Sequence, residues 1–375
     1  MQQPQNQNFN ADNRNNVNGQ GGYYAQPSPQ GGNYQGHAPG AGYPYPMYRP
    51  VYVPVYIQPP LPEHYEKAAV KKTAGRIGLG MLFLPAISFI FGIIIAVFSR
   101  VFYRANIDIS NSAIQLLLNI VITVLGFGSA AVFILSAEKP VLGRDFGFNR
   151  PKRENFVPAV MTGLGFCYVA NVSVSLLQNS FSWLFPFKQQ DVELPIGPWG
   201  FLLSVLAVAV IPALIEEFMF RGAVMGSLLK FSKPFAIFTS AALFGLMHGN
   251  LVQIPFAFMV GSVIAFADLE TGSFWTGVVI HFLNNFLSVI LDYAQMHFGE
   301  NITNTVFYFL TAVVIMLGFF GMYLMCRNNP NILQYENTPH KSSLVTRFGW
   351  FMGSAAIIVF LVITLAEIVA VQVTF

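Results

Sequence analysis

The feature that most constrains this chain is a series of apolar segments, each long enough to cross a lipid bilayer. A helix needs about 20 mostly apolar residues to span the hydrocarbon core, and its backbone polar groups must then be satisfied internally. Charged residues make up only 10% of the chain, whereas soluble domains carry about a quarter. The segments lie at about residues 77–98, 113–137, 156–178, 199–229, 234–250, 252–268, 274–292, 303–325 and 349–373.

These segments predict an all-α fold, a polytopic membrane helical bundle of about eight to nine transmembrane helices. Two of them, 234–250 and 252–268, are short for full spans, so one of the two could be re-entrant. The transmembrane domain would cover residues 67–375, and no connection is large enough to form a second globular domain.

Residues 1–66 have the composition of a disordered tail, in which Gln, Asn, Gly, Pro and Tyr dominate. Such a segment cannot bury enough apolar surface to offset the entropy lost on ordering. No basic stretch followed by an apolar run stands at its start, so a signal peptide is not indicated. The Tyr-Pro pattern within 42–56 fits either a partner that binds polyproline II segments or a tether without a specific ligand.

Basic residues gather in alternate connections between the apolar segments. They are Lys67, Lys71, Lys72 and Arg76 before the first span, Lys139, Arg144, Arg150, Lys152 and Arg153 after the second, Lys230 and Lys233 after the fourth, and Arg327, Lys341 and Arg347 after the eighth. Short loops rich in Lys and Arg stay on the cytoplasmic side. We therefore expect a multi-pass protein of the cell membrane with a cytoplasmic N-terminus.

Three ionisable residues interrupt the fourth apolar segment, in the run IPALIEEFMFRG. Each Asp, Lys or Arg at a membrane midplane costs about 2.5–3.5 kcal/mol, so such residues are rarely without a role. Glu217 and Arg221 lie four residues apart, share one helix face and can form an ion pair. Glu216 projects about 100° away from Glu217 and is therefore not used by this ion pair.

Helix geometry predicts that other polar residues meet Glu216. Glu216 and His248 lie about 16 residues on either side of the turn at 231–234, so an antiparallel hairpin brings them to the same depth. His281 and Asn285 are four residues apart on one face of the next helix but one, at a similar depth. Four polar side chains are therefore expected to converge inside the bilayer.

This constellation suits acyl transfer to water, that is, peptide hydrolysis within the membrane. A carboxylate beside an imidazole can take a proton from water, and an imidazole and an amide can donate to the developing oxyanion. A metal version would use Glu216, His248 and His281 as three ligands of a divalent ion such as zinc. The residues leave both versions open, with a cofactor either absent or metallic. A transporter or a catalytically silent immunity or scaffold protein could use the same polar cluster.

Three motifs in this order resemble the CPBP family, which groups CAAX prenyl endopeptidases with bacteriocin-processing or immunity proteins of the lysostaphin-resistance type. The motifs are EExxxR (Glu216-Glu217…Arg221), FxxxH (Phe244…His248) and HxxxN (His281…Asn285). The resemblance covers about residues 199–295 and implies an all-helical intramembrane protease core.

The resemblance also implies roles for single residues. Glu216 would be the water-activating base, helped by His248, while His281 and Asn285 would form the oxyanion site. Glu217 and Arg221 would orient or support them. The family has been described both as metalloproteases and as glutamate-type proteases. The implied partners are a membrane-embedded or membrane-associated peptide or protein substrate and the lipid bilayer, with no nucleic acid.

Overall fold

A computed structural model describes residues 62–105, 107–141, 147–181, 194–332 and 342–373. Within these ranges every regular element is a helix, and one isolated bridge joins Gly147 to Ser273. The elements are α1 (Glu63–Met81), α2 (Phe83–Arg104), α3 (Ser112–Glu138), α4 (Arg153–Phe181), α5 (Pro198–Ser204), η1 (Val205–Val210), α6 (Ile211–Glu217), η2 (Phe218–Met225), α7 (Gly226–Leu228), α8 (Lys233–Met247), α9 (Gln253–Thr271), α10 (Phe274–Phe298), α11 (Glu300–Asn328), α12 (Leu344–Met352) and α13 (Ala355–Val373). The predicted all-α class is confirmed.

Seven helical stretches in the described ranges are long and apolar enough to cross a membrane, or up to eight if the bent pair α12–α13 is one span. The chain is therefore a multi-pass membrane protein. Of the nine predicted segments, 234–250 became the shorter helix α8, Lys233–Met247. The last segment, 349–373, is broken by a bend of 74° between α12 and α13, at Gly353 and Ser354, which lie outside both helices.

Helix α1 begins earlier than the predicted tail ends. It starts at Glu63, so residues 63–66 are helical, while residues 1–61 lie outside the described part of the chain. Acidic residues in the first turn favour a helix N-terminus, and both Glu63 and Glu66 occur there. Glu66 is buried and accepts a hydrogen bond of 2.6 Å from Ser342. The helical boundary is thus set by a contact distant in sequence, which composition alone did not reveal.

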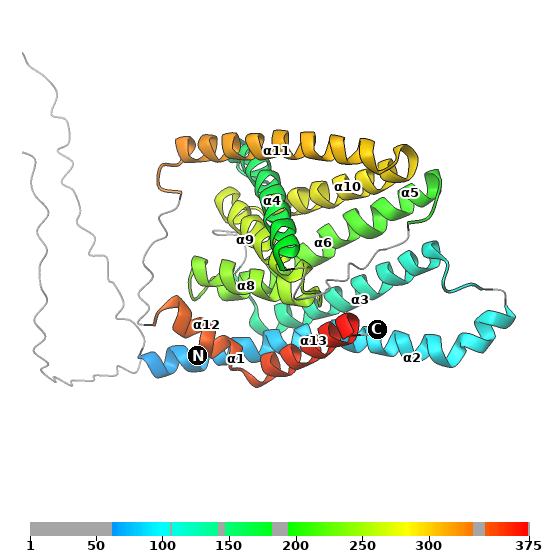
Figure 1. Ribbon diagram of the computed structural model, residues 1–375. Helices are drawn as coiled ribbons and strands as arrows, with labels where there is room; N and C mark the ends of the chain where they lie inside the picture. Colours follow the sequence, from blue (N-terminus) through cyan, green and yellow to red (C-terminus); the bar gives the residue numbers. More distant parts are fainter. Residues whose placement is uncertain (1–61, 106, 142–146, 182–193, 333–341, 374–375) are drawn as a thin grey trace, which may run out of the picture. The chain divides into compact units, whose positions relative to one another are not determined.

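The fourth span carries Glu216, Glu217 and Arg221. It runs without a break from Pro198 to Leu228 through α5, η1, α6, η2 and α7. Figure 1 shows α6 between α10 and α3, and it packs against both. Two stretches, η1 and η2, are π-helical, a geometry that is rare and frequent at functional sites.

Helices α8 and α9 approach each other through small residues. A Cβ at Gly261 would lie 3.4 Å from the Cα and Cβ of Ala241, and one at Gly245 only 2.7 Å from the carbonyl oxygen of Ile254. Close approach of this kind is typical of membrane helix pairs with small residues at the contact. It places the backbone of α9 at Gly261 within reach of the fourth span.

Candidate active site

Glu217 and Arg221, which follow Glu216 in the fourth span, form a fully buried ion pair. Arg221 Nε lies 3.0 Å from Glu217 Oε2, and neither side chain is exposed. The angle does not make this contact a hydrogen bond, so it is a charge pair. Arg221 Nη2 donates to the carbonyl of Gly261 at 2.9 Å, and the guanidinium lies over the ring of Phe244. The pair predicted from the four-residue spacing is confirmed.

Glu217 also holds the imidazole of His281. The distance from His281 Nδ1 to Glu217 Oε1 is 2.8 Å. An ionised carboxylate only accepts hydrogen bonds, so Nδ1 is the donor and carries the proton in the neutral ring. The other nitrogen, Nε2, faces Glu216 with 4.0 Å to its Oε2. His281 is therefore oriented on one side by Glu217 and presents its second nitrogen to Glu216.

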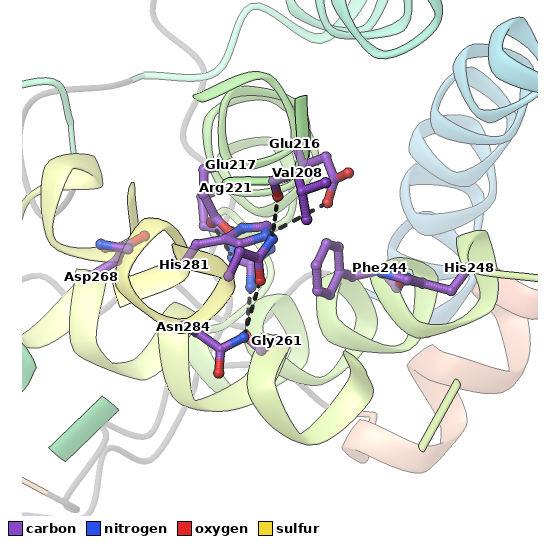
Figure 2. A network of polar contacts seen from close by, with 12 residues as sticks. Val208, Glu216, Glu217, Arg221, Phe244, His248, Gly261, Asp268, His281 and Asn284 are labelled. Carbon is purple, nitrogen blue, oxygen red and sulfur yellow. Dashed lines mark hydrogen bonds and ion pairs between the residues drawn. The ribbon is translucent and has the colours of Figure 1, made fainter. Parts of the chain in front are cut away.

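Glu216 opens into a cavity. Its side chain is 15% exposed, against 0% for Glu217, and it borders a cavity of about 270 Å³. In Figure 2 it extends to the side of the cluster on which Phe244 and His248 lie. Besides Glu216, the polar lining residues are Ser88, Asn119, Thr123 and His248.

His248 reaches the same cavity from the end of α8. Its Nδ1 lies 2.8 Å from the carbonyl of Phe244, so Nε2 is its available nitrogen. The Phe244 ring stands edge-on to both His248 and His281, and Figure 2 shows it between the two imidazoles. In the described part of the chain, no hydrogen bond or ion pair joins His248 to Glu216. The two residues predicted to meet share a cavity, while the ion-pair contact of Glu216 is with His281.

Asn285 shares the face of His281 and turns to the same span. Its Nδ2 donates to the carbonyl of Val208 at 3.0 Å, and its Oδ1 accepts from Asn284. Val208 lies in the π-helical stretch η1, and Pro212 has no N–H to offer its carbonyl in an i→i+4 bond. Asn285 thus ties α10 to the backbone of the fourth span.

The three residues considered as metal ligands do not converge. Within the described ranges, no group of three or more His, Cys, Asp or Glu side chains could hold a metal ion. The Phe244 ring packs edge-on against both His248 and His281 and separates the two imidazoles (Figure 2), so His248 does not join Glu216 and His281 around one point. The arrangement does not fit the zinc site that Glu216, His248 and His281 would form.

Asp268 is a buried acid that lies outside the three sequence motifs. It is fully buried at the end of α9, and its Oδ1 accepts the N–H of Gly277 in α10. A Cβ at Gly277 would lie 2.7 Å from its Oδ2, so that position requires glycine. A carboxylate near a helix N-terminus is favourable, and Asp268 fixes the start of the helix that carries His281. An acid a few residues before a tight turn was the available signal.

Comparison with known families agrees with this site. Residues 198–287 match the family model described as type II CAAX prenyl endopeptidase Rce1-like. This segment is an Rce1-like domain. No curated protein and no solved structure matched the chain. The match includes all three motifs and confirms the resemblance to the CPBP and CAAX protease family. At the level of the family, the match supports a CAAX-type intramembrane protease.

Proposed function

We propose that this protein is an intramembrane endopeptidase of the glutamate type, in which Glu216 activates the attacking water. The observation that carries the proposal is the position of Glu216, open to the cavity and 4.0 Å from the oriented Nε2 of His281. A water between these two atoms would lie within hydrogen-bond reach of both, which is the geometry that general base catalysis requires.

The reaction follows from these positions. Glu216 takes a proton from the water, and the hydroxide oxygen bonds to the carbonyl carbon of the peptide. For this step His281 must carry a second proton, taken up from solvent at Nε2 before the peptide binds. The ring keeps this proton and donates a hydrogen bond from Nε2 to the resulting oxyanion, while Glu217 stabilises the positive ring through Nδ1. Glu216 then gives its proton to the departing nitrogen as the C–N bond breaks. The Nδ1 of His248 donates to the Phe244 carbonyl, so the Nε2 of its neutral ring offers an acceptor at the cavity.

Asn285 has a supporting part in this mechanism. Because its Nδ2 bonds the Val208 carbonyl, it holds the backbone of the fourth span before Glu216, and oxyanion stabilisation falls to His281. The glutamate-type assignment rests on the separation of the three metal-ligand candidates. The distribution of basic connections supports a location in the cell membrane with the N-terminus in the cytoplasm.

The test compares the peptides of cells expressing the parent protein with those of cells expressing Glu216→Gln. General base catalysis contributes about 10²–10⁴-fold, so peptides cut from membrane proteins should appear only with the parent. Glu300→Gln, an acid at the exposed start of α11, is the matched control and should behave as the parent. Identical peptides from parent and Glu216→Gln cells would contradict the mechanism.

Two further experimental outcomes would contradict the proposal and favour another function or mechanism. Solute or proton flux in vesicles without peptide products would indicate a transporter. Stoichiometric metal in the purified protein, with activity lost to a chelator and restored by the ion, would contradict the glutamate-type assignment.

A further inference from the structure

The cavity beside Glu216 is completed by helices outside the family match. Glu216 and His248 lie within 198–287, whereas Ser88 belongs to α2 and Asn119 and Thr123 to α3. We propose that Ser88, Asn119 and Thr123 form the subsite that binds the main chain of the substrate, an unwound peptide segment of a membrane protein. This inference rests on the proposed protease function and adds the recognition of its substrate.

The three side chains have unused hydrogen-bonding capacity. Thr123 Oγ1 and Asn119 Oδ1 lie 3.5 Å apart, at the limit of a hydrogen bond. Within the described ranges, the Nδ2 of Asn119 and the hydroxyl of Ser88 have no protein partner, and both side chains are exposed at the cavity. Polar residues within membrane spans are rare and normally face the bundle interior or a water-filled cavity. Their position opposite the proposed base therefore indicates a ligand.

The chemistry of these groups matches a peptide bond. An Asn carboxamide offers one donor group and one acceptor, and hydroxyls can act as either. A peptide must unwind before its bond can be attacked, and its exposed N–H and C=O groups then need partners in the apolar bilayer. The lining from α2 and α3 carries no charge, whereas phosphate groups are bound by Arg and Lys. The lining therefore favours a peptide over a lipid headgroup.

The size of the cavity limits how much of the peptide it holds. Its volume of about 270 Å³ lies just below the range of about 300–1,000 Å³ typical of ligand pockets. Leu84, Ile122 and Met247 add apolar surface to the lining. We expect the cavity to take the residues next to the scissile bond, with an apolar side chain among them.

The first test uses purified protein in vesicles with a pool of synthetic membrane-spanning peptides that differ in one central residue. Asn119→Leu should lower kcat/KM about tenfold, mainly by raising KM, and should change which central residues are preferred. Thr123→Val should act in the same direction. Ser129→Ala is the matched control, because this α3 hydroxyl bonds carbonyls of its own helix and does not line the cavity.

The two proposals fail in different ways. Cleavage by Glu216→Gln at the parent rate would overturn the protease mechanism. Loss of cleavage in Glu216→Gln, with unchanged KM and preference in Asn119→Leu and Thr123→Val, would overturn the subsite alone.

The second test does not depend on cleavage. A photo-reactive residue at Ile122, in the inactive Glu216→Gln protein, should form adducts with the same peptides. The same residue at Leu125, which is exposed on α3 and does not line the cavity, should give at least about tenfold fewer. Adding Asn119→Leu should reduce the Ile122 adducts. Adducts with lipid alone would overturn the proposal.

Discussion

The two walls of the cavity are built in opposite ways. The wall that carries Glu216 is backed by Glu217, Arg221 and His281, which are buried and joined to one another or to a backbone carbonyl. On the other side, α2 has no buried residue along its length, and Ser88 of α2 and Asn119 of α3 are exposed where they line the cavity. The first wall has its charges fixed by packing, whereas the α2 part of the second wall has no buried residue to fix it.

This difference fits a division between chemistry and recognition. Groups that stabilise a transition state work best when surrounding structure holds them in place before the reaction. A wall that must admit substrates of varied sequence gains from lower local stability, which follows from few buried contacts. The comparison implies that substitutions in the first wall change stability strongly, and that substitutions on the outer face of α2 do not.

The largest effect is expected from Arg221→Met. Methionine fills much of the space but leaves the carboxylate of Glu217 buried without its cation, which costs about 3–5 kcal/mol. We expect this loss in the free energy of unfolding, measured by denaturant titration in detergent micelles.

The double variant Glu217→Gln/Arg221→Met is the control for charge. It buries neither ion, so it should recover a large part of the stability. A double variant no more stable than the single one would place the cost in the packing around position 221, against Phe244 and Gly261, rather than in the unpaired carboxylate.

A smaller loss is expected from Asn285→Leu. The Val208 carbonyl would lose its side-chain donor from α10, and removing one partner of a buried hydrogen bond costs about 1–3 kcal/mol. Asn284→Leu, which removes only the partner of the Asn285 side chain, should have the smaller effect in the same titration.

Kinetics on Asn285→Leu separate the two roles considered for this residue. Removing a donor to an oxyanion slows a reaction by about 10²–10³-fold. A variant as stable as the parent but slowed to this extent would assign Asn285 to the oxyanion site, as the sequence predicted.

Local spacing predicted the contacts that depend on one helix. The Glu217–Arg221 pair follows from four-residue spacing within the fourth span. The match of Glu216 and His248 in depth was less informative, because depth fixes position along the membrane normal and not the direction in which a side chain points. Phe244, one turn before His248, occupies the direction that faces Arg221 and His281.

Spacing within one helix could not predict contacts between segments that are distant in the sequence. The bond from His281 to Glu217 depends on how α10 rotates against the fourth span, which no local pattern specifies. Asp268 lies outside the three motifs, and its burial depends in part on residues 147–149, which bond the backbone and a side chain at the turn between α9 and α10. Ser88 and Asn119 lie outside the family match, so no motif pointed to them.

The smallest effect is expected from Ile93→Ala on α2, and it tests the comparison most directly. Ile93 is 48% exposed, whereas Ile77, in the same helical stretch, is fully buried. Lipid chains are as apolar as an isoleucine side chain, so Ile93→Ala loses little and should change the free energy of unfolding by no more than about 0.5 kcal/mol. Ile77→Ala leaves a cavity and should cost about 2–5 kcal/mol. Equal losses in the two variants would show that α2 packs against a protein surface in the membrane, such as a second copy of the chain, and would remove the contrast between the walls.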